Sequence, residues 1–228
     1  IIEPRGIFLS PLIGFNPNSE GEAEAFFPNN FTVNHSLAVI TDSHNYPLTV
    51  VQDHYVQSSL PENVVRIQVE FSTASSTPEY MTVTDVDNKT FTFNSVTRYT
   101  NYAQNVMRFY DRIYSNFTSL FNVTLDNVEL QWFLPDFQSL LTVGGFVPIT
   151  TGQRLGAINI NIAFVRSVNG TVEVIAAHEL VHRFIGTAGI SPNDFLWFHE
   201  GMAQYESLST ARKPGYQGAI PQKTTLDQ

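Results

Sequence analysis

The chain has 228 residues, room for one large domain or two small ones, and its 43% hydrophobic content excludes a disordered tail. Twelve basic residues stand against 21 acidic ones, and the net charge of −9 argues against nucleic acid or an anionic membrane as the main partner. Cysteine is absent, which excludes disulfides and thiolate metal sites. No apolar run approaches the roughly 18 residues of a membrane-spanning helix, so we expect no transmembrane segment.

The first part of the chain is predicted to be rich in β-structure. Residues 1–30, with many Pro, Gly and Asn, are expected to form an irregular lead-in. Asp87 and Asn88, ahead of Lys89, suit a hairpin turn. Short runs rich in Val and Thr predict strands over 48–56, 64–71, 80–85 and 90–93. We therefore predict a β-rich N-terminal domain over residues 1–97.

The pattern changes near Arg98, where apolar side chains begin to recur at spacings of three or four. This spacing, from Tyr99 to Leu120, predicts an amphipathic helix of about 20 residues. Alternating apolar residues then predict strands over 128–134 and 158–164, separated by a glycine-rich stretch.

Two further helices are predicted near the end of the chain. One should run from Thr171 to Ile185 and end at Gly186, and the next should begin at a Ser191 cap and continue to about Leu208. The second domain is therefore predicted over residues 98–228, and the whole chain in the α+β class.

The most informative segment is His178-Glu179-Leu180-Val181-His182, which lies in the first of these helices. On a helix, His178 and His182 are one turn apart on the same face, so both imidazoles can reach one tetrahedral zinc. Glu179 lies beside that face and can take the proton of a water whose pKa zinc has lowered. Roughly 0.01 such matches are expected by chance in a chain of this composition. The segment predicts a zinc site with Glu179 as general base.

Zinc needs a third protein ligand, and the next helix offers Glu200 within Trp197-Phe198-His199-Glu200-Gly201. The intervening residues suffice to finish one helix, turn, and bring a second helix back. His199 neighbours this ligand but should point about 100° away from it along the helix.

HELVHRFIG followed by NDFLWFHEGMAQY resembles the gluzincin metallopeptidases, especially the aminopeptidase N-like group. The resemblance implies a thermolysin-like catalytic domain, with a small sheet and zinc-binding helices, over residues 98–228. It implies Zn²⁺ bound by His178, His182 and Glu200, with Glu179 as catalytic base. It also implies that a peptide or protein is the substrate.

Two departures from the family pattern bear on activity. The aminopeptidases bind a free amine through a Glu in a G-x-M-E-N segment, and neither candidate here, residues 144–148 or 156–160, contains a Glu. Exopeptidase and endopeptidase activity therefore both stay open. The family's transition-state Tyr or His comes from a helical region well downstream of the Glu ligand, and the only Tyr so placed here is Tyr216. We expect a C-terminal helical part to be missing from this chain.

Six Asn-X-Ser/Thr sequons and the low lysine content favour an exported chain, extracellular or at the cell surface. The candidate glycosylation sites are Asn30, Asn34, Asn88, Asn116, Asn122 and Asn169. Two functional hypotheses result. The first is a secreted or surface zinc metallopeptidase. The alternative is a catalytically silent cell-surface structural or binding glycoprotein with the gluzincin fold.

Overall fold

The computed structural model describes residues 5–11, 13, 21–40, 45–47, 49–52, 55–60, 65–73, 79–85, 90–137, 140 and 142–220. The chain forms two compact units, Ile1–Pro78 and Glu79–Gln228. The division falls earlier than the predicted boundary at 97/98. The reason is that the two strands preceding that boundary pair within the sheet of the second unit rather than with the first.

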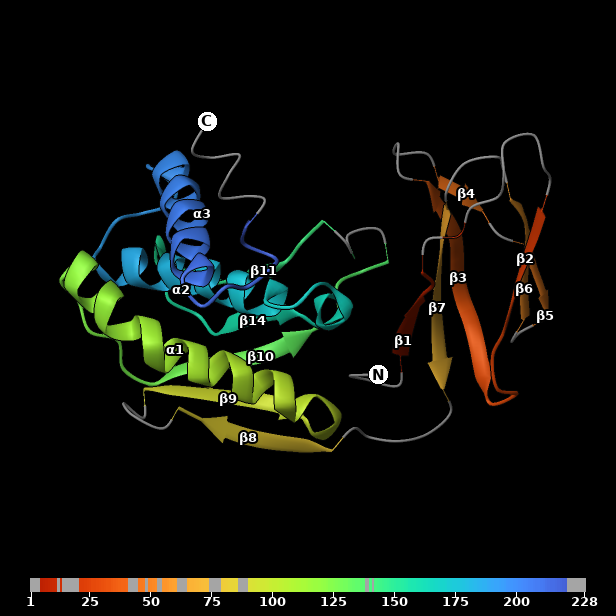
Figure 1. Ribbon diagram of the computed structural model, residues 1–228, viewed down its shortest axis with the longest axis horizontal. Coiled ribbons are helices and arrows are strands. Elements are labelled where there is room, and N and C mark those ends of the chain that lie inside the picture. The colour runs from red at the N-terminus through yellow and green to blue at the C-terminus, as the bar shows by residue number, and fades with distance from the viewer. Residues whose placement is uncertain are drawn as a thin grey trace. The chain divides into compact units, whose positions relative to one another are not determined.

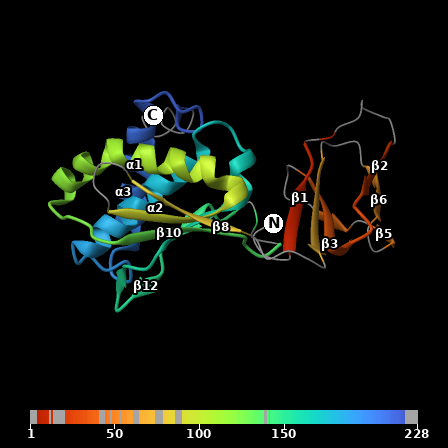
Figure 2. The ribbon, with the colours of Figure 1, turned by 90° about the horizontal axis from the view of Figure 1, so that it is seen from below.

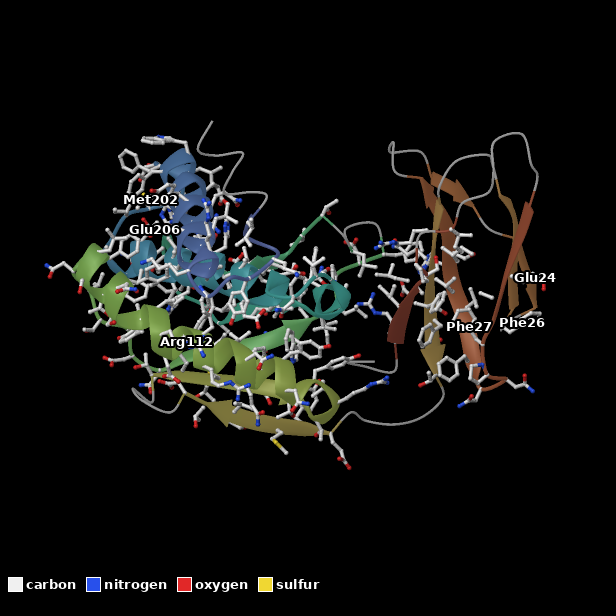
Figure 3. The ribbon with its side chains drawn as sticks, in the orientation of Figure 1. Glu24, Phe26, Phe27, Arg112, Met202 and Glu206 are labelled. Atoms are coloured by element: carbon white, nitrogen blue, oxygen red, sulfur yellow. The ribbon has the colours of Figure 1, made fainter. Side chains whose placement is uncertain are left out.

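Within its described residues, the first unit forms two antiparallel sheets. Their strands are β1 (Arg5–Leu9), β7 (Val65–Thr73), β3 (Phe31–Ile40) and β4 (Asn45–Pro47) in one sheet, and β2 (Gly21–Phe26), β6 (Tyr55–Leu60) and β5 (Thr49–Gln52) in the other. Ile67 and Val69 of β7 are buried and form the core of this unit. Phe8, Val33 and Phe27 (labelled in Figure 3) pack against them. Residues 1–30 were expected to be irregular, but β1 and β2 lie within them because each finds a strand partner far along the chain.

The second unit is built on a mixed five-stranded sheet in the order β11-β14-β10-β9-β8. β9, β10 and β14 are parallel, and the edge strands β8 and β11 run antiparallel to their neighbours. The bounds of these strands are Tyr80–Thr84 (β8), Phe91–Val96 (β9), Val128–Phe133 (β10), Gly145–Phe146 (β11) and Ile158–Asn161 (β14). The predicted hairpin turn at 87–89 lies outside the described residues.

Three α-helices accompany this sheet in the part of the chain that the structure describes: α1 (Thr100–Phe121), α2 (Thr171–Thr187) and α3 (Leu196–Arg212). Short 3₁₀ segments η1 (Thr97–Tyr99) and η2 (Ile162–Arg166) and a small hairpin, β12 (Ile149–Thr150) with β13 (Gln153–Arg154), complete the unit. Figures 1 and 2 show α1 and α2 lying over one face of the sheet. This mixture of helices and sheets is compatible with the predicted α+β class. Among the described residues, no helix combines the length and the apolar character needed to cross a bilayer.

Helix α1 forms where the apolar periodicity predicted it, and its stripe packs on the sheet. The ring of Tyr110 lies 4.7 Å from that of Phe91 on β9, and both side chains are fully buried. The Tyr110 hydroxyl donates a 2.7 Å hydrogen bond to the Ala176 carbonyl of α2. Since Ala176 lies two residues before His178, this bond ties α2 to the core beside the predicted zinc segment.

The strand predicted over 158–164 is shorter than expected. β14 ends at Asn161, whose side-chain oxygen accepts a 2.9 Å hydrogen bond from the Ala163 amide and so begins η2. The Asn161 amide donates to the carbonyls of Leu140 and Val143, each at 2.7 Å. Asn161 is therefore buried, and so are the other three residues of β14. Both faces of the strand are covered, whereas the sequence pattern predicted a strand with one apolar face.

Three predicted helix boundaries also differ from the structure. α3 ends at Arg212, one turn beyond the predicted end near Leu208. α2 continues past Gly186 to Thr187, since Gly186 is a buried packing position within the helix. α3 begins at Leu196 instead of Ser191, because the Ser191 hydroxyl accepts a 3.2 Å bond from the Asn193 amide and closes a local turn.

Tyr110→Phe should lower the free energy of unfolding by about 1 kcal/mol, because it removes a buried hydrogen bond while keeping the aromatic packing. Urea unfolding measures the change. Tyr102→Phe is the matched control on the same helix, since Tyr102 is 38% exposed, and it should change stability by less than about 0.5 kcal/mol. Equal effects of the two substitutions would contradict the role assigned to the Tyr110–Ala176 bond.

Candidate metal centre

The structure brings the three predicted ligands together. The Nε2 atoms of His178 and His182 are 3.1 Å apart, and each lies 3.4 Å from Oε2 of Glu200. Their ligand atoms all fall within 4.8 Å of one another, close enough to hold one metal ion. The cluster combines a buried His182, a partly exposed His178 and a Glu200 whose side chain is 46% exposed.

Helix α2 supplies both histidines because positions four residues apart share one face. Glu200 reaches them because α3 packs against α2. Both helices carry fully buried apolar residues, among them Leu180, Val181, Ala203 and Leu208. The expected packing of the two helices is observed among the described residues, and the three side chains that it brings together could hold a metal ion.

His199 was expected to point away from the site, but it contacts His182. The two rings stack with centroids 5.6 Å apart, and their Nδ1 atoms are 3.4 Å apart. His199 Nε2 lies 2.9 Å from the Ile190 carbonyl, which can only accept, so Nε2 carries the proton and Nδ1 is the acceptor. His182 must then donate from Nδ1, which leaves the lone pair of its Nε2 facing Glu200.

This arrangement turns acceptor atoms toward one another. The Nε2 lone pair of His182 and the carboxylate oxygen of Glu200 are 3.4 Å apart with no proton assigned between them. Burial lowers the pKa of His182 to about 4, so the ring is neutral at physiological pH. A cation between these atoms removes the repulsion, which supports the assignment of this cluster as a metal site.

Glu179 is buried beside the cluster and is not one of its ligands. Its Oε2 has no hydrogen-bond partner, and burial raises its pKa from 4.5 to about 7, against the lowering effects of His178 and Arg154. Gly145 on the edge strand β11 makes this position possible, since a Cβ there would lie 2.8 Å from the Glu179 Cγ atom. Glu179 therefore has the placement and the raised pKa of a proton acceptor close to neutrality.

Arg154 is a part of the site that no sequence motif indicated. Its Nη2 donates a 2.9 Å charge-assisted bond to Oε1 of Glu200, on the opposite side of the carboxylate from the histidines. The contact with His178, together with the charge of Arg154, holds the pKa of Glu200 well below its usual range. The only signal in the sequence was a lone arginine in a Gly-rich segment, which specifies no partner.

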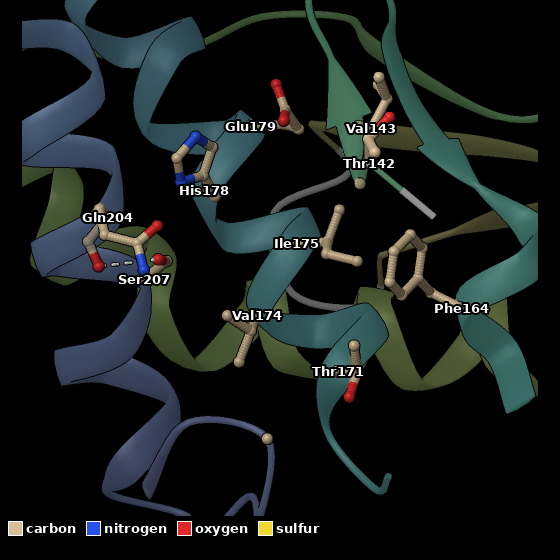
Figure 4. Close-up of a pocket in the computed structure, with 13 residues that line it drawn as sticks. Thr142, Val143, Phe164, Thr171, Val174, Ile175, His178, Glu179, Gln204 and Ser207 are labelled. Atoms are coloured by element: carbon tan, nitrogen blue, oxygen red, sulfur yellow. Dashed lines mark hydrogen bonds between the residues drawn. The ribbon is translucent and has the colours of Figure 1, made fainter. Parts of the chain in front are cut away.

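A cavity of about 450 Å³ opens beside the cluster (Figure 4). Figure 4 shows His178 and Glu179 at one end of it, with Gln204 and Ser207 of α3 along one side and Phe164 on the other. Apolar side chains of α2, Val174 and Ile175, form its floor. The cavity leaves open the side of the cluster formed by His178 and Glu179.

The remaining candidate residues lie elsewhere. Tyr216 packs edge-on to Phe109, with ring centroids 5.3 Å apart, and covers Gly170 at the start of α2, so it does not join the cluster. Of the candidate glycosylation sites, Asn30, Asn34, Asn116, Asn122 and Asn169 are exposed, and Asn88 lies outside the described residues. Their modification stays a prediction.

The sequence matches no protein-family model, and no curated protein is significantly similar to it.

In the metal-free protein, Glu179→Gln should stabilise the fold above pH 7. Burial places the folded pKa of Glu179, about 7, above its ordinary value of 4.5, so the ionised carboxylate destabilises the fold by on the order of 3 kcal/mol. That destabilisation is fully present above the folded pKa and absent below the unfolded one. Gln carries no charge at any pH, so its advantage should appear at pH 8 and vanish at pH 4.

Urea unfolding of the chelator-treated protein at the two pH values measures this difference. Glu129→Gln is the control, because Glu129 is exposed on β10, and its effect should be small at both pH values. A Glu179→Gln effect of the same size at pH 4 and pH 8 would contradict the assigned burial of a carboxylate.

Proposed function

We propose that this protein is a zinc metallopeptidase, acting on peptide or protein substrates outside the cell or at its surface. The observation that carries the proposal is the convergence of His178, His182 and Glu200, with the buried carboxylate of Glu179 beside them and its Oε2 without a hydrogen-bond partner. The resemblance of the two segments to the gluzincin pattern supports the same reading.

The cluster fits zinc in both donor type and spacing. Tetrahedral zinc with bonds of about 2.0–2.1 Å holds neighbouring ligand atoms about 3.3–3.4 Å apart. The three separations here are 3.1, 3.4 and 3.4 Å. Two imidazoles and one carboxylate are also the ligand set of catalytic zinc sites, which keep a further position open.

Bound zinc would supply Lewis-acid chemistry, polarising a carbonyl and lowering the pKa of water. Glu179 would accept the proton of the attacking water and then deliver it to the leaving amine. Its burial beneath β11 keeps the carboxylate out of bulk water, and Oε2, which has no hydrogen-bond partner, is available for this transfer.

Substrate backbone would pair with β11. β14 is not available for this pairing, because β11 and β10 flank it on both sides. β11 is the edge strand, and an edge strand has unpaired backbone groups that an extended peptide can use. Gly145 of this strand lies over Glu179, so a peptide there would pass beside the base.

The silent alternative has one observation in its favour. Tyr216, the downstream tyrosine singled out in the sequence, packs against Phe109 rather than at the cluster. A protein that binds zinc without turnover would then use the site for structure or recognition.

Purified protein should carry about one zinc per chain, and His182→Ala should lose it, since two protein ligands rarely hold zinc. Glu179→Gln should keep zinc, because Glu179 is not a ligand, while peptide hydrolysis falls by a factor of about 10² to 10⁴. Elemental analysis and a peptide-cleavage assay on the same samples make the comparison.

Loss of zinc from Glu179→Gln would show that the ligand and base roles are wrongly divided. Equal, barely detectable hydrolysis by wild type and Glu179→Gln, with zinc bound to both, would replace the enzyme with the silent alternative. A wild type that binds no zinc would refute the site itself.

If the protein is active, hydrolysis should not depend on a free N-terminus, because residues 144–148 and 156–160 contain no carboxylate to bind an amine. Paired peptides of one sequence, with free and acetylated N-termini, should be cleaved at rates that agree within a few-fold. Strict dependence on the free amine would point to an anchor outside these two segments.

A further inference from the structure

We propose that Arg154, carried by the β12–β13 hairpin, is a positioning residue of the metal centre. It holds one oxygen of Glu200 so that the other oxygen faces both histidines. The inference rests on the proposed zinc site and extends it to a segment outside the two motif helices.

The contacts divide the two oxygens of Glu200 between different partners. Oε1 accepts the 2.9 Å bond from Nη2 of Arg154, while Oε2 lies 3.4 Å from both imidazoles. The Glu200 side chain is 46% exposed, whereas that of Arg154 is only 14% exposed. A half-exposed glutamate has rotamers that point into solvent, and the buried guanidinium is the group that selects the inward one.

The hairpin reaches this position because of Gly186. A Cβ on Gly186 would lie 2.9 Å from both the backbone nitrogen and the backbone oxygen of Arg154, closer than real side chains approach backbone. Gly186 follows His182 by four residues, and His182 follows His178 by four, so all three lie on one face of α2. The hairpin backbone therefore packs on the same helix face that presents the ligands.

Two effects of Arg154 on zinc oppose each other. Its positive charge repels the cation, which would weaken zinc binding, and its bond to Oε1 fixes the ligand, which would strengthen binding. Partners of metal ligands commonly contribute about 10- to 100-fold in affinity. Glu200 is exposed and needs ordering, so we infer that positioning outweighs repulsion.

The test is the zinc affinity of Arg154→Met, measured by competition with a chromophoric chelator. Met keeps much of the apolar bulk and removes the guanidinium, and the affinity should fall by about 10- to 100-fold. The visible absorption of the Co²⁺-loaded protein should change as well, because it reports the geometry of the ligands. Arg154→Lys keeps the charge without the planar fork and should restore affinity only in part.

Gly186→Ala tests the positioning role of Arg154 without changing its side chain, because a Cβ at this position would meet the Arg154 backbone. Ala is the better helix former, yet its Cβ should displace the hairpin and lower zinc affinity in the same direction as Arg154→Met. Gly201→Ala is the matched control. It lies in α3 next to Glu200, and a Cβ there meets no atom within 4 Å, so affinity and Co²⁺ spectrum should stay as in wild type.

The outcomes separate this inference from the proposed function. If the wild type binds zinc and Arg154→Met binds it with equal or higher affinity, the positioning role is overturned, but the proposed metal site is not. If Arg154→Met keeps the wild-type zinc affinity but has a lower kcat, Arg154 would contact the substrate, and the positioning role would again be overturned. If wild type binds no zinc, the proposed function fails and the inference fails with it. Melting of the metal-free variants near the wild-type temperature shows that weaker binding is not a folding defect.

Discussion

The metal centre depends on the packing of α3 against α2. A helical turn can bring His178 and His182 together without help, but Glu200 reaches them only because α3 packs against α2. The same two helices form walls of the cavity, so one interface determines both the ligand triangle and the space beside it.

The cluster is fixed from one side and open on the other. His182 is held through His199 to the Ile190 carbonyl, and Glu200 is held by Arg154. His178 and Glu179 instead line the cavity. The cluster is thus held on one side, while one imidazole and one carboxylate face the cavity on the other. The buried carboxylate of Glu179 destabilises the fold when it is ionised.

The strongest periodic signals in the sequence predicted the elements that carry the ligands. Helix α2 and the spacing of His178 and His182 follow from local pattern alone, and α1 follows from its apolar stripe. The sequence could not place β1 and β2, because their partners lie far along the chain and the segment has a loop-like composition. It could not assign Arg154 or His199 either. Their roles depend on contacts between segments that are distant in the sequence. The backbone of Arg154 packs closely on Gly186, and the ring of His199 stacks on a ring from another helix.

The central claim is that one zinc ion is held by two imidazole nitrogens and one carboxylate oxygen. X-ray absorption spectroscopy of the zinc-loaded protein tests it most directly, because it reads donor types and bond lengths at the metal. The account predicts a four-coordinate shell with bonds of about 2.0–2.1 Å and the outer-shell scattering of two imidazoles, reduced to one in His182→Ala. A six-coordinate, all-oxygen shell without imidazole scattering would contradict the assignment of the site.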